Sequence, residues 1–240
     1  MSIAARVDAA VFERHPDYVA VIVTALGVVN GPSDARSDRR LEEAEASLRA
    51  RGLARAAYDP RIAAWRAAFG AFGAKPSKYL SSAEALAARV LKGQPLPRIN
   101  RLVDLYNAVS LRRLLPVGGE DRDRLEGELR LVVARGDEPF DPRGDGAEPE
   151  HAAPGEIVWR DDRGVTCRRW NWRQGVRTQL TERTRSAFFV LDGLPPLSPT
   201  ELDDAAAELS AGIVELAPGA EVTIARLTRA SADLGRSPPS

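Results

Sequence analysis

Residues 99–113, INRLVDLYNAVSLRR, constrain the fold of this chain more than any other stretch. At about 100° per residue, apolar side chains cover most of the circumference of the helix that this segment predicts. The remaining narrow stripe has short polar members; it holds Asn100, Asp104, Asn107 and Leu111. A buried helix with such a stripe can line a ligand pocket, or its short polar groups can bond to nearby backbone or to solvent. Spacing alone leaves these interpretations open.

The composition limits the classes of protein to consider. With 240 residues, of which 44% are hydrophobic and 28% charged, the chain can bury one large core or two small ones. Its formal net charge is zero, so binding to nucleic acid or membrane would need a local patch. Cys167 is the only cysteine, which excludes an intramolecular disulfide and a paired-cysteine metal site. No signal peptide or membrane span is predicted, and we expect a cytoplasmic protein without membrane contact.

Hydrophobic patterns predict alternating helices and strands. The β-branched run at residues 18–29 predicts a buried strand, closed by a turn at residues 30–32. Further helices are predicted over residues 33–51, from Asp59-Pro60 onward with Trp65 and Phe69, over 83–92 with Ser82 as cap, and over 198–216 with Ser198 as cap. Further strands are predicted over residues 114–117, 129–134, 156–160, 165–172, 187–191 and 221–227, with turns at Gly118-Gly119 and at 161–164. We expect a disordered tail from about Ser231.

Residues 136–155 form the longest segment without a helix or strand pattern. They hold four prolines, four glycines and six acidic residues against one arginine. Such a composition predicts a surface loop. The loop is either a plain connection or a lid.

Several kinds of active site lack their usual sequence support. The two histidines, His15 and His151, have no clustered partners, which argues against a histidine triad or a zinc site. No GxxxxGK[ST] loop is present, and Gly70 and Gly73 do not follow a strand in a dinucleotide-binding pattern. We therefore expect no metal and no cofactor. An enzyme of this sequence would use carboxylates, amides, hydroxyls, backbone N–H groups and bound water.

Residues 168–185 combine six arginines and one glutamate with two tryptophans. Guanidinium groups bind phosphates and indoles stack on bases, so the mixture suits RNA. Alternatively, Trp170 and Trp172 fill the core while the arginines are solvated. Strand alternation places both tryptophans with Arg168 on one face and the other arginines of the strand on the opposite face. The predicted RNA-binding residues are Arg169, Arg173 and Arg177, with Lys75 and Lys78 from the loop at 70–82.

Several segments, taken in order, resemble the B3/B4 domain. They are LVDLYNAVSL, LEGELRLVVARGDEPF, GEIVWRD, CRRWNWRQ and TQLTERT, and they run from about residue 75 to 191. The B3/B4 domain is the editing domain within the bacterial phenylalanyl-tRNA synthetase β subunit, and this chain most resembles its stand-alone relatives. The resemblance implies a mixed α/β (α+β) domain whose pocket hydrolyses the ester of a tRNA carrying the wrong amino acid. It places Asp104, Asn107 and Glu156 in that pocket.

These observations together define the expected organisation and site. We expect one compact unit, with a strand and helices of residues 1–74 packed on a B3/B4-like core of residues 75–230 and a tail of residues 231–240. The expected catalytic residues are Glu156, Asn107 and Asp104. The expected substrate-binding residues are Asn100, Ser110, Asn171 and Arg173.

The predicted function is that of an aminoacyl-tRNA deacylase acting with a positioned water. The predicted partner is tRNA, without DNA. The alternative, from a different class, is a non-catalytic binder of an amino acid, a small metabolite or tRNA on the same fold.

Overall fold

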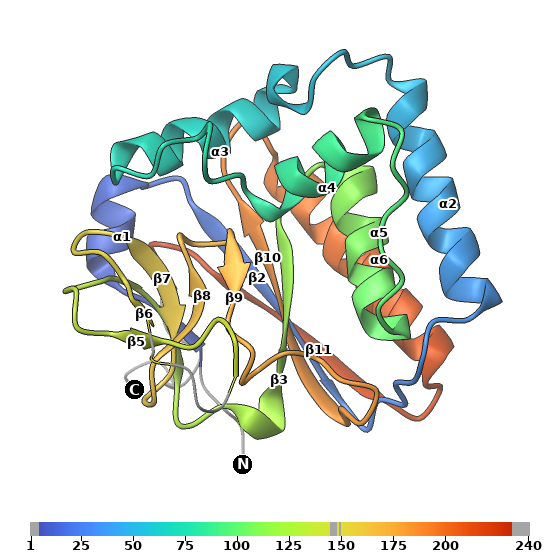
Figure 1. Ribbon diagram of the computed structural model, residues 1–240. Helices are drawn as coiled ribbons and strands as arrows, with labels where there is room; N and C mark the ends of the chain where they lie inside the picture. The colour runs from blue at the N-terminus through green and yellow to red at the C-terminus, as the bar shows by residue number, and fades with distance from the viewer. Residues whose placement is uncertain (1–4, 145–147, 149, 232–240) are drawn as a thin grey trace.

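The strands of the protein form two sheets (Figure 1). The computed structural model describes residues 5–144, 148 and 150–231. One sheet has the order β11-β2-β10-β3, from β2 (Val19–Leu26), β3 (Val117–Asp121), β10 (Ser186–Gly193) and β11 (Glu221–Leu227). The other has the order β1-β4-β7-β8-β5-β6, with β9 paired to β8. Its strands are β1 (Ala5–Val7), β4 (Leu129–Val133), β5 (Pro139–Phe140), β6 (Glu150–His151), β7 (Ile157–Arg160), β8 (Val165–Arg168) and β9 (Arg173–Gln174).

Helices cover one face of the four-stranded sheet, and others lie across one end of the two sheets (Figure 1). They are α1 (Ala9–Arg14), α2 (Ala35–Ala50), α3 (Pro60–Ala71), α4 (Ser82–Leu91), α5 (Arg101–Arg113) and α6 (Pro199–Leu216), with 3-10 turns at Ala56–Tyr58 and Arg122–Arg124. Helices α5 and α6 pack against the four-stranded sheet, and α2 packs on the outer side of α5. This mixture of helices and sheets confirms the predicted α+β class.

Strand β2 lies inside the four-stranded sheet, between β10 and β11. All eight of its residues pair with β10 in antiparallel register. Its apolar sequence fits this place, because one face of the strand packs toward α6 and the other toward the second sheet. Residues 1–74 therefore supply a central strand of the sheet, and do not merely rest on its surface.

Local sequence signals place the helix ends well. Asp59 caps α3 ahead of Pro60 by accepting a hydrogen bond from the Arg61 backbone. Ser198 and Glu201 form a reciprocal capping box at α6, as its sequence predicts. Helix α4 differs from expectation by one residue, because Ser81 and not Ser82 accepts the capping hydrogen bond from Glu84.

The predicted turn at Gly118-Gly119 is wrong. Both glycines lie within β3, opposite Val190 and Phe189 of β10, and the preceding helix ends at Leu114 in a left-handed conformation. Strands β3 and β4 consequently belong to different sheets. Paired glycines favour a turn because their backbone is flexible. Here, however, their backbones pair with the neighbouring strand, so both glycines are part of the sheet.

The predicted strand at residues 165–172 is wrong beyond Arg168. Arg169 and Trp170 both adopt positive φ angles, 45° and 64°, which stops the extended chain. Trp170 turns into the core between the sheets, and strand alternation therefore does not sort the arginines that follow. The short elements β1 and α1 were not predicted, and the loop at 136–155 contains β5 and β6. Of the expected disordered tail, residues 232–240 lie outside the described residues.

Candidate functional site

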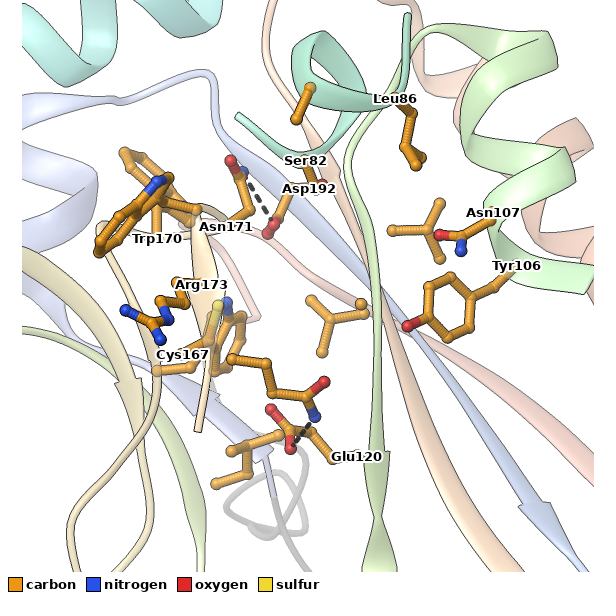
Figure 2. A pocket seen from close by; sticks show the side chains of 18 residues that line it. Ser82, Leu86, Tyr106, Asn107, Glu120, Cys167, Trp170, Asn171, Arg173 and Asp192 are labelled. Atoms are coloured by element: carbon orange, nitrogen blue, oxygen red, sulfur yellow. Dashed lines mark hydrogen bonds between the residues drawn. The ribbon is translucent and has the colours of Figure 1, made fainter. Parts of the chain in front are cut away.

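A pocket of about 260 Å³ lies between the two sheets, below the start of α4 and beside α5 (Figure 2). Strands of both sheets and the loop after β8 contribute to its wall. The lining residues are Ser82, Ala85, Leu86, Tyr106, Asn107, Val117, Gly118, Glu120, Leu129, Trp159, Cys167, Trp170, Asn171, Trp172, Arg173, Gln174, Val190 and Asp192. Most of this surface is apolar, with polar groups at a few points, as in small-molecule sites generally.

Strand register explains where the two carboxyl groups of the pocket lie. Alternate residues of a strand face the same side, so Asp192 and Val190 of β10 both face the second sheet. In the pairing of β3 with β10, Gly118 lies opposite Val190 and Glu120 lies opposite Phe188. Asp192 and Glu120 are therefore near opposite ends of one floor, with Cα atoms about 14 Å apart by strand geometry.

Asp192 is held by two hydrogen bonds, and Figure 2 shows the one from Asn171. Tyr18 donates its hydroxyl to Oδ1 at 2.5 Å, and Asn171 donates its amide to Oδ2 at 3.1 Å. Burial raises the pKa of Asp192 to about 6, against the hydrogen bonds from Tyr18 and Asn171, which lower it. The carboxyl group is thus mostly ionised at pH 7 while still able to take a proton.

Four buried polar atoms of pocket residues lack a hydrogen-bond partner among the described residues. They are Ser82 Oγ, Asn171 Oδ1, Trp159 Nε1 and Trp170 Nε1. Ser82 and Asn171 are neighbours, since the Ser82 backbone N–H donates to the Asn171 carbonyl at 2.9 Å. Buried polar atoms usually have partners, so these atoms leave the pocket with hydrogen-bonding groups that water or a ligand can use.

Glu120 occupies the other end of the floor. The side-chain amide nitrogen of Gln174 donates to Glu120 Oε2 and to the Gly119 carbonyl, both at 2.6 Å. Burial raises the pKa of Glu120 to about 8, although hydrogen bonding with Thr178 and Gln174 lowers it in part. Burial likewise raises the pKa values of Tyr106 and Cys167, whose side chains also line the pocket.

Three of the predicted site residues line this pocket: Asn107, Asn171 and Arg173. They come from α5, from the loop after β8 and from β9, so the fold brings together residues about 65 positions apart in the sequence. Asn107 is buried and Arg173 is exposed.

The other polar residues predicted for the site on α5 and at its N-cap have structural contacts instead. Asn100 is the N-cap of the helix, with its side chain accepting from the Val103 backbone at 3.0 Å. Asp104 accepts from the Ile99 backbone at 3.0 Å and from the Ser33 hydroxyl at 2.5 Å. Ser110 donates to the Leu115 carbonyl at 2.7 Å. None of these three lines the pocket, and for them the alternative interpretation of bonding to nearby groups describes the contacts.

Glu156 lies outside the pocket lining, in a buried ion pair. Its two carboxylate oxygens accept from Arg168 Nε at 3.0 Å and Nη2 at 2.8 Å, and Oε1 also accepts from the Arg169 backbone. Burial alone would raise the pKa of Glu156, but the hydrogen bonds and charge of Arg168 bring it below its ordinary value. These contacts tie the start of β7 to the left-handed turn at Arg169.

The predicted RNA-binding residues differ in how exposed their side chains are and in whether other groups already bind them. The Arg169 guanidinium is stacked on the rings of Tyr79 and Trp172, 3.8 and 4.4 Å from their centroids. Arg177 is bound to buried Asp161 at 2.7 Å. The side chains exposed on the surface are Lys75, Lys78 and Arg173.

Sequence reasoning missed Tyr18, Glu120 and Asp192. One sequence signal was available for Asp192, which is an acidic residue at the end of an otherwise apolar strand. Burying a charge is costly, so an acidic residue at such a place indicates a specific role. No sequence signal connects Tyr18 to Asp192, since 174 positions separate them and only the pairing of β2 with β10 brings them together.

Two kinds of feature are not found in the part of the chain that the structure describes. No group of three histidine, cysteine or acidic residues there is arranged to hold a metal ion. No helix there is long and apolar enough to cross a membrane.

Residues 64–217 match the B3/4 domain over more than half of the chain. The chain belongs to the B3/4 domain family. The match runs from α3 through α6 and includes Glu120 and Asp192, while Tyr18 and β2 lie before it. It confirms the resemblance seen in the sequence and extends it at both ends.

This B3/4 domain chain was also compared with solved structures and with curated proteins. Sixteen chains of solved structures match it significantly. One is an N-terminal fragment of the phenylalanyl-tRNA synthetase beta subunit from Pyrococcus horikoshii, with 12% identity and a TM-score of 0.49. The alignment covers 92% of this chain and 50% of that one, so the chain spans about half the length of the fragment. No curated protein gives a significant match.

Proposed function

We propose that this protein hydrolyses the ester bond between an amino acid and a tRNA, and the pocket between the sheets is the observation that carries the proposal. Its volume of about 260 Å³ is near the lower end of small-molecule sites, which suits an aminoacyl group. Its unpartnered polar atoms suit the polar head of such a group. Membership in the B3/4 domain family, with the editing activity that the resemblance implies, supports the same reaction.

Asp192 is the residue assigned to activate water. In this reaction its carboxylate takes a proton from a water molecule, whose oxygen attacks the ester carbonyl carbon. The bond from that carbon to the ribose oxygen then breaks, and the departing oxygen receives the proton. A pKa of about 6 suits this role, because the group is ionised at neutral pH and accepts a proton readily.

Asn107 and Ser82 are assigned to hold the aminoacyl group. The Asn107 amide can donate to the carbonyl oxygen as negative charge develops there. Asn171 Oδ1 and Ser82 Oγ can accept N–H bonds from the α-amino group. These assignments replace Glu156 and Asp104, whose side chains are engaged outside the pocket lining.

The exposed basic residues beside the pocket are assigned to the tRNA. Arg173 lines the pocket itself, and Lys78 lies over the Tyr79 ring, which contacts Trp172 of the pocket wall. Lys75 is in the same exposed loop. Positive charge at this place would attract the phosphates of an RNA whose aminoacyl end enters the pocket.

A panel of mischarged tRNAs, incubated with the full chain, tests the proposal. We expect amino acid release above the spontaneous rate for at least one tRNA, with kcat/KM rising with pH around an apparent pKa near 6. The variant Asp192→Asn should abolish release, whereas Asp204→Asn, at an exposed position of α6, should not. Absence of release from every tRNA would refute the deacylase.

The second candidate is a binder of an amino acid or metabolite without chemistry, and one observation favours it. Both oxygens of Asp192 already accept hydrogen bonds, an arrangement that also suits a fixed binding group. This candidate predicts a higher melting temperature with free aromatic amino acids and no turnover of any tRNA.

A further inference from the structure

We propose that Glu120 selects aminoacyl groups whose side chain ends in an ammonium group. This inference rests on the proposed function, and it assigns the amino acid class that the pocket admits. It follows from the place of Glu120 in the pocket, from its charged surroundings and from the chemistry of the wall between it and Asp192.

The floor of the pocket separates its two acidic ends. Asp192 and Glu120 lie near opposite ends of the same face of the four-stranded sheet, with Val190 and Gly118 between them. A group whose head lies at Asp192 would therefore point its side chain along the floor toward Glu120. Figure 2 shows the two carboxyl groups at separate ends of the pocket.

The middle of the pocket is suited to an aliphatic chain. The pocket lining includes the apolar side chains of Val117, Leu129 and Val190 and the ring of Trp159, and strand register places Val190 between Asp192 and Glu120. Apolar surface of this kind gains from burying methylene groups, at about 0.8 kcal/mol each. A side chain of several methylenes ending in a polar group matches the order of surfaces from the middle of the pocket to Glu120.

Among the described residues, the groups that hydrogen-bond to the Glu120 carboxyl are neutral. Its closest partner is the amide of Gln174, and Tyr106 of α5 and Cys167 of β8 are neutral acids. Arg177 adds positive charge, but that guanidinium is in an ion pair with Asp161 at 2.7 Å. A buried carboxylate is costly unless a cation compensates it, and a ligand ammonium would provide that charge.

The test is calorimetric titration of the full chain with L-lysinamide, L-norleucinamide and L-tyrosinamide. Norleucinamide equals lysinamide without its terminal nitrogen, so the ratio of the two dissociation constants isolates that nitrogen. We expect lysinamide to bind at least tenfold more tightly than either of the others. In Glu120→Gln the preference over norleucinamide should fall to about twofold or less, and in Glu221→Gln, an exposed position of β11, it should remain.

Three outcomes would overturn the inference. They are equal binding of lysinamide and norleucinamide by the natural chain, a preference that survives in Glu120→Gln, and tyrosinamide binding as tightly as lysinamide. Measurable norleucinamide binding without a preference would leave the proposed function standing, whereas a lysinamide preference without tRNA hydrolysis would leave only the inference. If none of the three amides binds, both fail.

Discussion

Replacing Gly118 with valine should narrow the pocket without harming the fold. The glycine lies in β3 on the pocket floor, and a Cβ placed there would meet no atom within 4 Å. Its φ angle is not positive, so valine can adopt the backbone conformation, and β-branched residues suit a strand. Loss of glycine flexibility in the unfolded chain should raise the free energy of unfolding by about 0.4–1 kcal/mol.

The same substitution should weaken ligand binding strongly. Three added carbon atoms, each filling about the 30 Å³ of one water molecule, would remove about a third of a cavity of about 260 Å³. Overfilling a packed site costs about 1–3 kcal/mol, which corresponds to a loss of affinity of about five- to 150-fold. Deacylation measured below saturation should fall by a similar factor.

Urea unfolding and the deacylation assay together check this prediction. Gly70→Ala is the matched control, since a Cβ at this position of α3 also meets no atom within 4 Å and lies away from the pocket lining. It should raise stability and leave the reaction rate unchanged. If Gly118→Val hydrolyses aminoacyl-tRNA at the natural rate while stably folded, the substrate does not occupy this pocket.

Three further predictions concern the ion pair, pH and RNA. Glu156→Ala leaves Arg168 without its buried partner and should lower the free energy of unfolding by about 3 kcal/mol in urea; unchanged stability with lost hydrolysis would instead make Glu156 catalytic. Because the pKa of Glu120 rises from 4.5 to about 8 on folding, the folded chain keeps a proton that the unfolded chain releases, and stability falls as pH rises across that window. Glu120→Gln should remove this part of the fall between pH 5 and 8, and an identical pH dependence in both proteins would contradict the burial argument. Changing Arg173 and Lys78 to glutamine should weaken tRNA binding and reduce the slope of log affinity against log salt by up to about 0.9 per lost phosphate contact, at unchanged melting temperature; an unaltered slope would exclude them from the RNA surface.

Local sequence signals predicted where helices and strands lie better than they predicted which strands pair with one another. The apolar run that forms β2, the capping box at Ser198 and the proline after Asp59 each act within a few residues, so the sequence alone places those elements. The pair Gly118-Gly119 misled because glycine permits a turn without requiring one. Pairing with β10 decided the matter, and such pairing depends on residues about 70 positions later.

The sequence could predict a residue of the site only where a local pattern, such as the periodicity of a helix, placed that residue on the side facing the pocket. The helical stripe identified Asn107, but the same stripe holds Asn100 and Asp104, which bond to groups near the helix start. Periodicity reports which residues share a helix face and not what lies opposite that face. Asp192 and Tyr18 meet through sheet pairing, which a single sequence does not reveal.

The position of β2 at the centre of the sheet also has a consequence for biosynthesis. Residues 19–26 leave the ribosome well before their partner β10, which begins at residue 186. At synthesis rates of about 5–20 residues per second, this apolar strand waits about 8–33 s before it can pair. During that time its edges are open to pairing with other chains, so slow translation or a stalled ribosome should make this protein aggregate through this strand.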